Sequence, residues 1–314
     1  MIIAAVLVVG AALTGVFGPR LLIGLERSSA SPAALLCVWW SALTWMAVSA
    51  IAALAVLLIP IHDGAPAPLA QLLATCYASL TSSQFHPDEV GAALITVLVL
   101  MGLFRAIGRG GRSVRAVRQE AETTMWMLEP AGTWEHGVLW LDHPSAVAFS
   151  VGGRAKAIVA TSGLRRILSP LETTAVLAHE RAHLSGRHHV QVLLADALAA
   201  AVPLLPLFRE APAVIRRLVE LAADDQAARY VSADVVRRAL VSVAIGGDQG
   251  LPPAALGAAT SSIEVRLARL ARPVRLRSRP GQAGEKACFV AAGALIPLLT
   301  GAASVAAFIT VSCV

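Results

Sequence analysis

Four long stretches of this chain are apolar and almost free of charge, and they constrain its fold more than any other feature. They cover residues 2–22, where Arg20 is the first charge, 32–60, 90–104 and 287–312. A helix needs about 20 mostly apolar residues to cross a hydrocarbon layer about 30 Å thick. Apolar residues make up 56% of the chain and charged residues 15%, whereas soluble domains average about 45–50% and about 25%. The sequence therefore predicts a multi-pass α-helical membrane protein and excludes a soluble globule.

The distribution of basic residues predicts the orientation of the chain, because cytoplasmic loops retain Lys and Arg. Arg20 and Arg27 lie at the junction of the first two stretches, and the loop of residues 61–89 has neither Lys nor Arg. Every other basic residue lies between 105 and 286, so we expect both termini on the outer side. The predicted division is a membrane region with three helices at 1–104, a cytoplasmic domain at 105–286, and a fourth transmembrane helix with a short outer tail at 287–314.

The net charge of +6 raises nucleic acid and anionic lipid as partners. Two runs of arginines, at 105–118 and 266–279, flank predicted membrane helices. Anionic headgroups lie at that depth, so we expect the lipid bilayer as a partner and no nucleic acid.

The four cysteines have no short metal-ligand spacing. Cys76 and Cys313 both fall on the expected outer side, where a disulfide between them is permitted. Cys37 and Cys288 fall in or near predicted membrane helices and are expected to be packing residues.

A helix start can be read in the expected cytoplasmic domain. Ser169 as the cap, Pro170 at the first helical position and Glu172 three residues after the cap form a capping box. Gly186 is suited to the left-handed conformation that often follows the last helical turn. We therefore expect a helix from about residue 170 to 185.

That helix carries the pattern HExxH, formed by His179, Glu180 and His183. Residues four apart share a helix face, so both imidazoles can bind one ion while Glu180 stands beside them as the general base. Catalytic zinc usually has three protein ligands and a water in the fourth position, whose pKa it lowers. The alternative is a core helix on which two buried histidines are satisfied by hydrogen bonds.

The third ligand is predicted from residues 212–230, which read as a helix and place Glu220 and Asp224 four apart. We expect Glu220 to bind the metal and Asp224 to accept a hydrogen bond from the outer nitrogen of a liganding histidine. Ligation by two histidines and one glutamate favours Zn²⁺. A solvated acidic face would explain the same spacing.

Residues 190–208 are nearly apolar and resemble another membrane span. However, His183 before them and Glu220 after them have to reach the same ion. Pro203 and Pro206 also interrupt a straight helix. We therefore expect a hairpin at about 190–208 that touches or enters the inner leaflet.

Short apolar segments before the HExxH helix predict a small sheet. Segments 146–151 and 155–160 flank Gly152 and Gly153 and read as a hairpin. Because an exposed strand edge binds an extended peptide as an additional strand, we expect substrate contacts along one segment; a plain core hairpin is the alternative. The residues expected to bind substrate are Ala146, Val147, Ala148, Phe149 and Ser150.

The chain has, in order, three spans, IVATSGL at 158–164, HExxH, ELAAD at 220–224 and a last span. This order resembles that of the membrane zinc metallopeptidases of the BlaR/MecR antirepressor family, which are related to HtpX-type proteases. The resemblance covers most of the chain and implies a multi-pass α-helical membrane protein with an inserted cytoplasmic α+β zincin-like metalloprotease domain. In it, His179, His183 and Glu220 would bind zinc and Glu180 would be the general base. It also implies signal transduction by cleavage of a cytoplasmic protein, typically a transcriptional repressor.

One departure from the family concerns the input signal. Members that sense beta-lactams carry a penicillin-binding domain after the last span, and here residues 312–314 alone follow it. We therefore expect a chain without that sensor, in which the loop of residues 61–89 or a partner protein receives any signal.

The function expected is a membrane-embedded zinc endopeptidase that cleaves a cytoplasmic protein. A non-catalytic membrane receptor or scaffold with a structural metal site is the alternative, and a module that binds anionic lipid is a third hypothesis. The sequence retains Glu180, which a structural site would not need. The sequence does not fix the oligomeric state, so a homodimer stays open.

Overall fold

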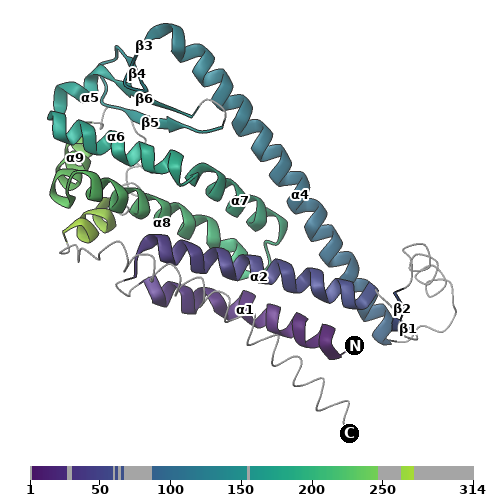
Figure 1. Ribbon diagram of the computed structural model, residues 1–314. Coiled ribbons are helices and arrows are strands. Elements are labelled where there is room, and N and C mark those ends of the chain that lie inside the picture. Colours follow the sequence, from purple (N-terminus) through teal and green to yellow (C-terminus); the bar gives the residue numbers. More distant parts are fainter. Residues whose placement is uncertain are drawn as a thin grey trace.

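The protein is a helix-rich α+β structure in which a small sheet lies at one end of a set of long helices (Figure 1). The computed structural model describes residues 2–26, 30–58, 61–62, 65–66, 87–153, 156–246 and 263–271. Its elements are α1 (Ile2–Glu26), α2 (Pro32–Leu58), β1 (Ile61–His62), β2 (Ala65–Pro66), α4 (Pro87–Leu128), η1 (Glu129–Ala131), β3 (Gly132–Glu135), β4 (Val138–Leu141), β5 (Ala148–Val151), β6 (Ala157–Thr161), α5 (Ser162–Ile167), α6 (Pro170–Ser185), α7 (His188–Ala201), α8 (Pro206–Tyr230) and α9 (Ala233–Gly246). A further short helix covers residues 263–270.

The first three apolar stretches each form helix, in α1, α2 and α4. Within the described residues, one window, Pro32–Ser49 of α2, is both long and apolar enough to cross a membrane. Helix α4 has 42 residues, about 63 Å at 1.5 Å per residue, and continues without a break through the expected domain boundary at residue 105. The fourth stretch, 287–312, and three cysteines, Cys76, Cys288 and Cys313, lie outside the described residues, and Cys37 is a half-buried free thiol.

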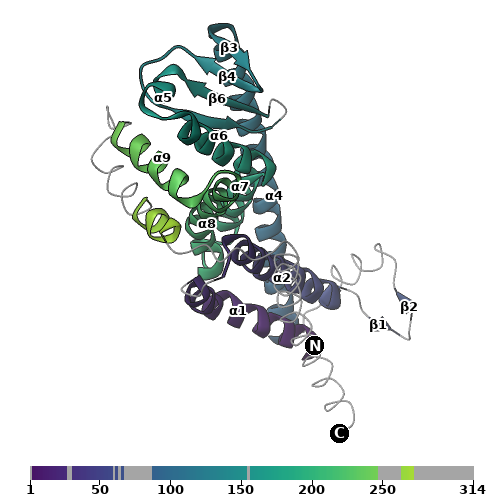
Figure 2. The ribbon, with the colours of Figure 1, turned by 60° about the vertical axis from the view of Figure 1, so that its left-hand side comes forward.

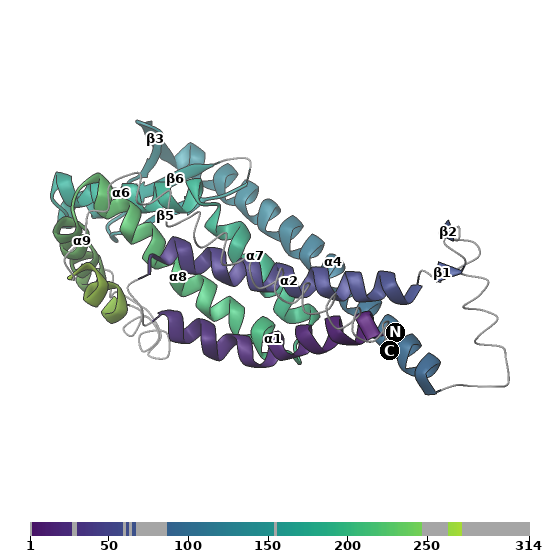
Figure 3. The same cartoon turned by 60° about the horizontal axis from the view of Figure 1, so that its bottom comes forward.

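One apolar core joins the N-terminal helices to the helices of the expected cytoplasmic domain. Helices α1 and α2 lie side by side in all three views and both pack against α8 (Figures 1, 2 and 3). Trp39 and Leu43 of α2 are fully buried against Leu207 and Ile215 of α8. This burial gives a physical reason for α8 to begin at Pro206, six residues before the predicted start, and to accommodate Pro212 inside the helix.

The four-stranded sheet has the order β3-β4-β6-β5. Strands β4 and β6 are parallel and the other two pairs are antiparallel. The predicted hairpin is present, with Ala148 opposite Ala160 and Val151 opposite Ala157. One face of the sheet packs on α5 and α6, and the other packs on the last turns of α4. Strand β5 is therefore an edge strand next to the HExxH helix.

The start of α6 was predicted correctly. The Ser169 side chain accepts from the backbone N–H of Glu172, and the Glu172 carboxylate accepts from the backbone N–H of Ser169. The helix also ends at Ser185, as predicted, but the conformation after it differs: Gly186 is right-handed, and Arg187 takes the left-handed conformation with φ of 49°. A Cβ at Gly186 would clash with the His188 ring, so the glycine gives room to that side chain.

Residues 188–230 form a helical hairpin, with α7 and α8 packed together around a turn at residues 202–205. Its first helix also packs against α4, and Trp40 of α2 donates a hydrogen bond from Nε1 to Gln191 Oε1 at 3.0 Å. The chain thus reverses between His183 and Glu220, as the metal hypothesis requires.

Candidate metal centre

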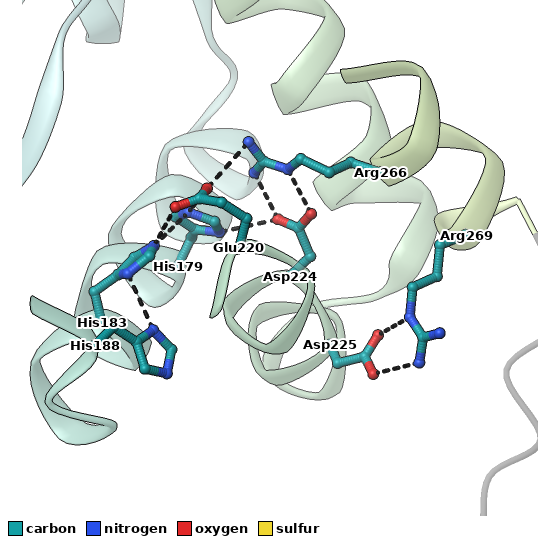
Figure 4. A network of polar contacts seen from close by, with 8 residues as sticks. All are labelled: His179, His183, His188, Glu220, Asp224, Asp225, Arg266 and Arg269. Carbon is teal, nitrogen blue, oxygen red and sulfur yellow. Dashed lines mark hydrogen bonds and ion pairs between the residues drawn. The ribbon is translucent and has the colours of Figure 1, made fainter. Parts of the chain in front are cut away.

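Two histidines of α6 and one glutamate of α8 converge on one point (Figure 4). His179 and His183 are one helical turn apart and project from the same face of α6, against which α8 packs. Glu220 comes from the facing side of α8. Their ligand atoms all lie within 4.8 Å of one another, so the structure brings together the three residues predicted to bind the metal.

The distances between these atoms fit a divalent cation with tetrahedral coordination. Zinc lies about 2.0–2.1 Å from histidine nitrogens, so neighbouring ligand atoms of a tetrahedral site are about 3.3 Å apart. The two Nε2 atoms of His179 and His183 are 3.0 Å apart. Glu220 Oε2 is 3.5 Å from His179 Nε2, and Glu220 Oε1 is 3.4 Å from His183 Nε2. The donor set and its spacing suit Zn²⁺.

Asp224 lies behind His179, at the ring nitrogen to which the sequence analysis assigned a hydrogen bond. Its Oδ1 is 2.9 Å from His179 Nδ1, and its side chain is 1% exposed. The two atoms form a close ion pair without the alignment of a linear hydrogen bond. Burial disfavours the charge on His179, but the contacts with Asp224 and Glu220 outweigh it and raise the pKa of His179 to about 9. Asp224 therefore orients the imidazole so that Nε2 faces the metal position.

His188 lies behind His183 and was not predicted in this role. The two Nδ1 atoms are 3.0 Å apart, and the rings meet edge to face. Burial lowers the pKa of His188 to about 4, and burial and the charge of His179 lower the pKa of His183 to about 4. Both rings are then neutral at pH 7, and in the tautomer with the proton of His183 on Nδ1, facing His188, its Nε2 is able to bind a cation.

Arg266, on the short helix 263–270, is the second residue that the sequence analysis missed. Its Nε and Nη2 donate to Asp224 Oδ2 and Oδ1, both at 2.7 Å, and its Nη1 is 3.4 Å from Glu220 Oε2. One turn later, Arg269 makes the same two-pronged contact with Asp225, at 3.2 and 2.9 Å (Figure 4). These two arginines were expected at lipid headgroups, and the structure corrects that assignment, because both side chains are paired with carboxylates of α8.

Glu180 lies beside the two histidines in a position suited to a general base. It lines a cavity of about 220 Å³ together with His179, Glu220, Arg266 and Ala148. Burial raises the pKa of the Glu180 carboxyl, and hydrogen bonds from the side chain and backbone of Ser150 partly offset this. A carboxylate with a raised pKa accepts protons more readily near neutral pH than an exposed one.

The residues predicted to bind substrate lie on or next to the edge strand β5. Ala148, Phe149 and Ser150 are in the strand, and Ala146 and Val147 immediately precede it. The backbone N–H of Thr161 donates to Val147, so the alternation of an antiparallel ladder also directs the backbone groups of Phe149 toward β6. The N–H and C=O groups of Ala148 and Ser150 therefore point to the other edge of β5, which pairs with no strand in the described part of the chain.

A family described as peptidase family M48 matches residues 115–280, just over half of the chain. The match begins within α4 and covers the sheet, α6, the α7–α8 hairpin, α9 and the helix of residues 263–270. No solved structure matches the chain.

Proposed function

The chain belongs to peptidase family M48, and from this membership we propose that it is a membrane-embedded zinc endopeptidase that cleaves a cytoplasmic protein. The observation that carries the proposal is the convergence of His179, His183 and Glu220 at the spacing of a tetrahedral site, with Glu180 beside them. A bound zinc ion would polarise both a water molecule and the scissile carbonyl.

The roles of the chain's own residues follow from their positions. Glu180 takes a proton from the attacking water and returns it to the leaving amine, a role that its raised pKa suits. Asp224 and His188 hold the rings of His179 and His183 from behind. Contacts with His179 and the charge of Arg266 outweigh the effect of burial and lower the pKa of Glu220, which keeps it ionised as a ligand.

Strand β5 is the proposed binding site for an extended substrate. Its free edge lies next to α6, Ala148 lines the same cavity as His179 and Glu180, and Ser150 contacts the proposed base. A peptide added to this edge would run past the metal position and would pair with the outward backbone groups of β5 that Glu180 does not already engage.

We propose that α1, α2, residues 90–104 of α4 and the segment 287–312 cross the membrane, with residues 105–286 in the cytoplasm and both termini outside. The positive-inside distribution of Lys and Arg supports this orientation. Large apolar side chains that stay exposed on α1 and α4 support lipid contact, among them Leu21 at 72% and Phe104 at 79% exposed.

The α7–α8 hairpin is proposed to enter the inner leaflet beside α1 and α2. Leu204 in its turn is 90% exposed. The neighbouring Leu205 packs beside Gly15, inside the first apolar stretch. The charged pair in the hairpin, Asp196 and Arg216, is joined by two contacts at 2.8 and 2.6 Å, which lowers the cost of bringing either charge near lipid.

The sequence resemblance to the BlaR/MecR antirepressor family suggests a transcriptional repressor as the substrate and signal transduction as the purpose. We propose no role in binding nucleic acid, since Arg266 and Arg269 face carboxylates of α8.

The decisive experiment compares cells that produce the wild-type chain, the Glu180→Gln variant or a control variant, Glu210→Gln. Glu210 lies near the start of α8. The Glu180→Gln protein should keep its zinc but lose cleavage, so that one or more intact cytoplasmic proteins accumulate relative to wild type and the control. If Glu180→Gln retains both zinc and the cellular output, the non-catalytic receptor hypothesis replaces the peptidase.

A further inference from the structure

The short helix of residues 263–270 brings a guanidinium group directly behind the metal centre. Arg266 is mostly buried, and its Nε and Nη2 atoms occupy both oxygens of Asp224 at 2.7 Å. Its remaining nitrogen, Nη1, is 3.4 Å from Glu220 Oε2. We propose that Arg266 is a positioning residue of the metal centre, which fixes the Glu220 ligand directly and the His179 ligand through Asp224; this rests on the proposed function.

The contacts of Asp224 define how Arg266 acts on His179. Asp224 Oδ1 is shared between Arg266 Nη2 and His179 Nδ1. Because the planar guanidinium holds both carboxylate oxygens in one plane, Asp224 cannot rotate away from the imidazole. A lysine at this position would supply the charge but not the two-pronged geometry.

Glu220 is restrained by the same side chain. Its Oε2 faces Arg266 Nη1, while its Oε1 faces His183 Nε2. The guanidinium therefore restricts rotation of the carboxylate about its last torsion and keeps one oxygen directed at the metal position. Arg266 thus links two of the three ligands, although it contacts neither of the histidines.

The charges around the site also support a positioning role for Arg266. Glu180, Glu220 and Asp224 contribute three negative charges when ionised, and Arg266 contributes one positive charge. A divalent cation would then make the group neutral, which is the condition under which buried charges are tolerated. Without Arg266 the site would keep an uncompensated negative charge at the 1% exposed Asp224.

The helix of residues 263–270 has other attachments, which makes the role of Arg266 separable from simple docking. Leu270 is buried in a cluster with Ala178 of α6 and Val236 of α9. Arg269 pairs with Asp225 through the same fork geometry between the same two helices, but no contact of Asp225 with a proposed metal ligand occurs in the described residues. Arg269→Ala is therefore a matched control that weakens docking and leaves the metal centre untouched.

The test measures zinc affinity of the full-length chain in detergent, by competition with a chromophoric chelator, and the visible spectrum of the cobalt-loaded protein. Arg266→Ala should weaken zinc binding by about 10- to 100-fold, the usual effect of removing an outer partner of a metal ligand. Arg269→Ala should stay within about 2-fold of wild type, because it lacks that role. Arg266→Lys should fold but give an altered cobalt spectrum, since ligand geometry changes when the fork is lost.

Equal losses of zinc affinity in Arg266→Ala and Arg269→Ala would overturn the proposal in favour of a docking role. Wild-type affinity in Arg266→Ala, or a wild-type cobalt spectrum in Arg266→Lys, would also overturn it. If Arg266→Ala does not fold, the cobalt spectrum of Arg266→Lys tests the proposal: an altered spectrum supports it, and a wild-type spectrum overturns it. Failure of the proposed function is distinguishable. If Glu180→Gln keeps both zinc and the cellular output, the peptidase function fails while the role of Arg266 at the metal centre stands, whereas a wild-type chain that binds no zinc would remove both.

Discussion

Replacing Asp224 with Asn should destabilise the fold far more than the same change at the adjacent Asp225. Asp224 is 1% exposed and accepts two hydrogen bonds at 2.7 Å from Arg266, which is itself 16% exposed. The amide keeps the shape but removes the charge, so the buried guanidinium loses its closest counter-ion and keeps Glu220, at 3.4 Å from Nη1. Breaking a buried ion pair in this way costs about 3–5 kcal/mol.

The Asp225 pair has the same geometry but a wetter environment. Its carboxylate is 23% exposed and Arg269 is 26% exposed. Solvent screening reduces such a pair to about 0–1 kcal/mol. The two neighbouring aspartates of one helix therefore provide an internal comparison in which burial is the variable.

Thermal unfolding of the detergent-solubilised chain, followed by circular dichroism with excess chelator, measures this difference without a contribution from metal release. At about 2–4 °C per kcal/mol for a domain of 150–250 residues, Asp224→Asn should lower the melting midpoint by about 6–12 °C at the low end of the cost. Asp225→Asn should lower it by less than about 4 °C. Similar shifts in both variants would refute the argument from burial.

Three further changes probe other parts of the account. His188→Ala should weaken zinc binding by about 10- to 100-fold in chelator competition, because His183 Nδ1 loses its partner at 3.0 Å; unchanged affinity would remove His188 from the metal centre. Ala148→Pro should reduce peptide cleavage at unchanged zinc content, because it deletes an N–H on the free edge of β5; full activity would exclude β5 as the substrate strand. In Leu204→Trp, bromine-labelled acyl chains of reconstituted vesicles should quench more fluorescence than they quench from the six native tryptophans of wild type, since Leu204 is 90% exposed at the hairpin turn; no quenching beyond wild type would argue against membrane entry.

The local parts of the site could be predicted because they obey helix periodicity. A capping box fixed the start of the HExxH helix, and the four-residue spacings placed His179 over His183 and Glu220 over Asp224. The need for His183 and Glu220 to reach the same ion also predicted the reversal of the chain between them.

Contacts between distant segments could not be predicted in the same way. Arg266 is 42 residues from Asp224 and belongs to a run of arginines with no local signal that distinguishes its members. His188 was visible as a histidine, but its contact with His183 depends on the turn at Gly186 and Arg187, where the left-handed residue is not the glycine. Helix α8 begins earlier than expected because burial against α2 outweighs the disruption by Pro212.

Zinc X-ray absorption on the purified wild-type chain and on Glu220→Ala tests the metal centre most directly. We expect one zinc per wild-type chain, with two imidazoles and oxygen ligands at about 2.0–2.1 Å, and a variant that loses either the zinc or the carboxylate from the coordination shell. A wild-type chain without zinc, or an identical coordination shell in Glu220→Ala, would contradict the convergence of His179, His183 and Glu220 on one ion.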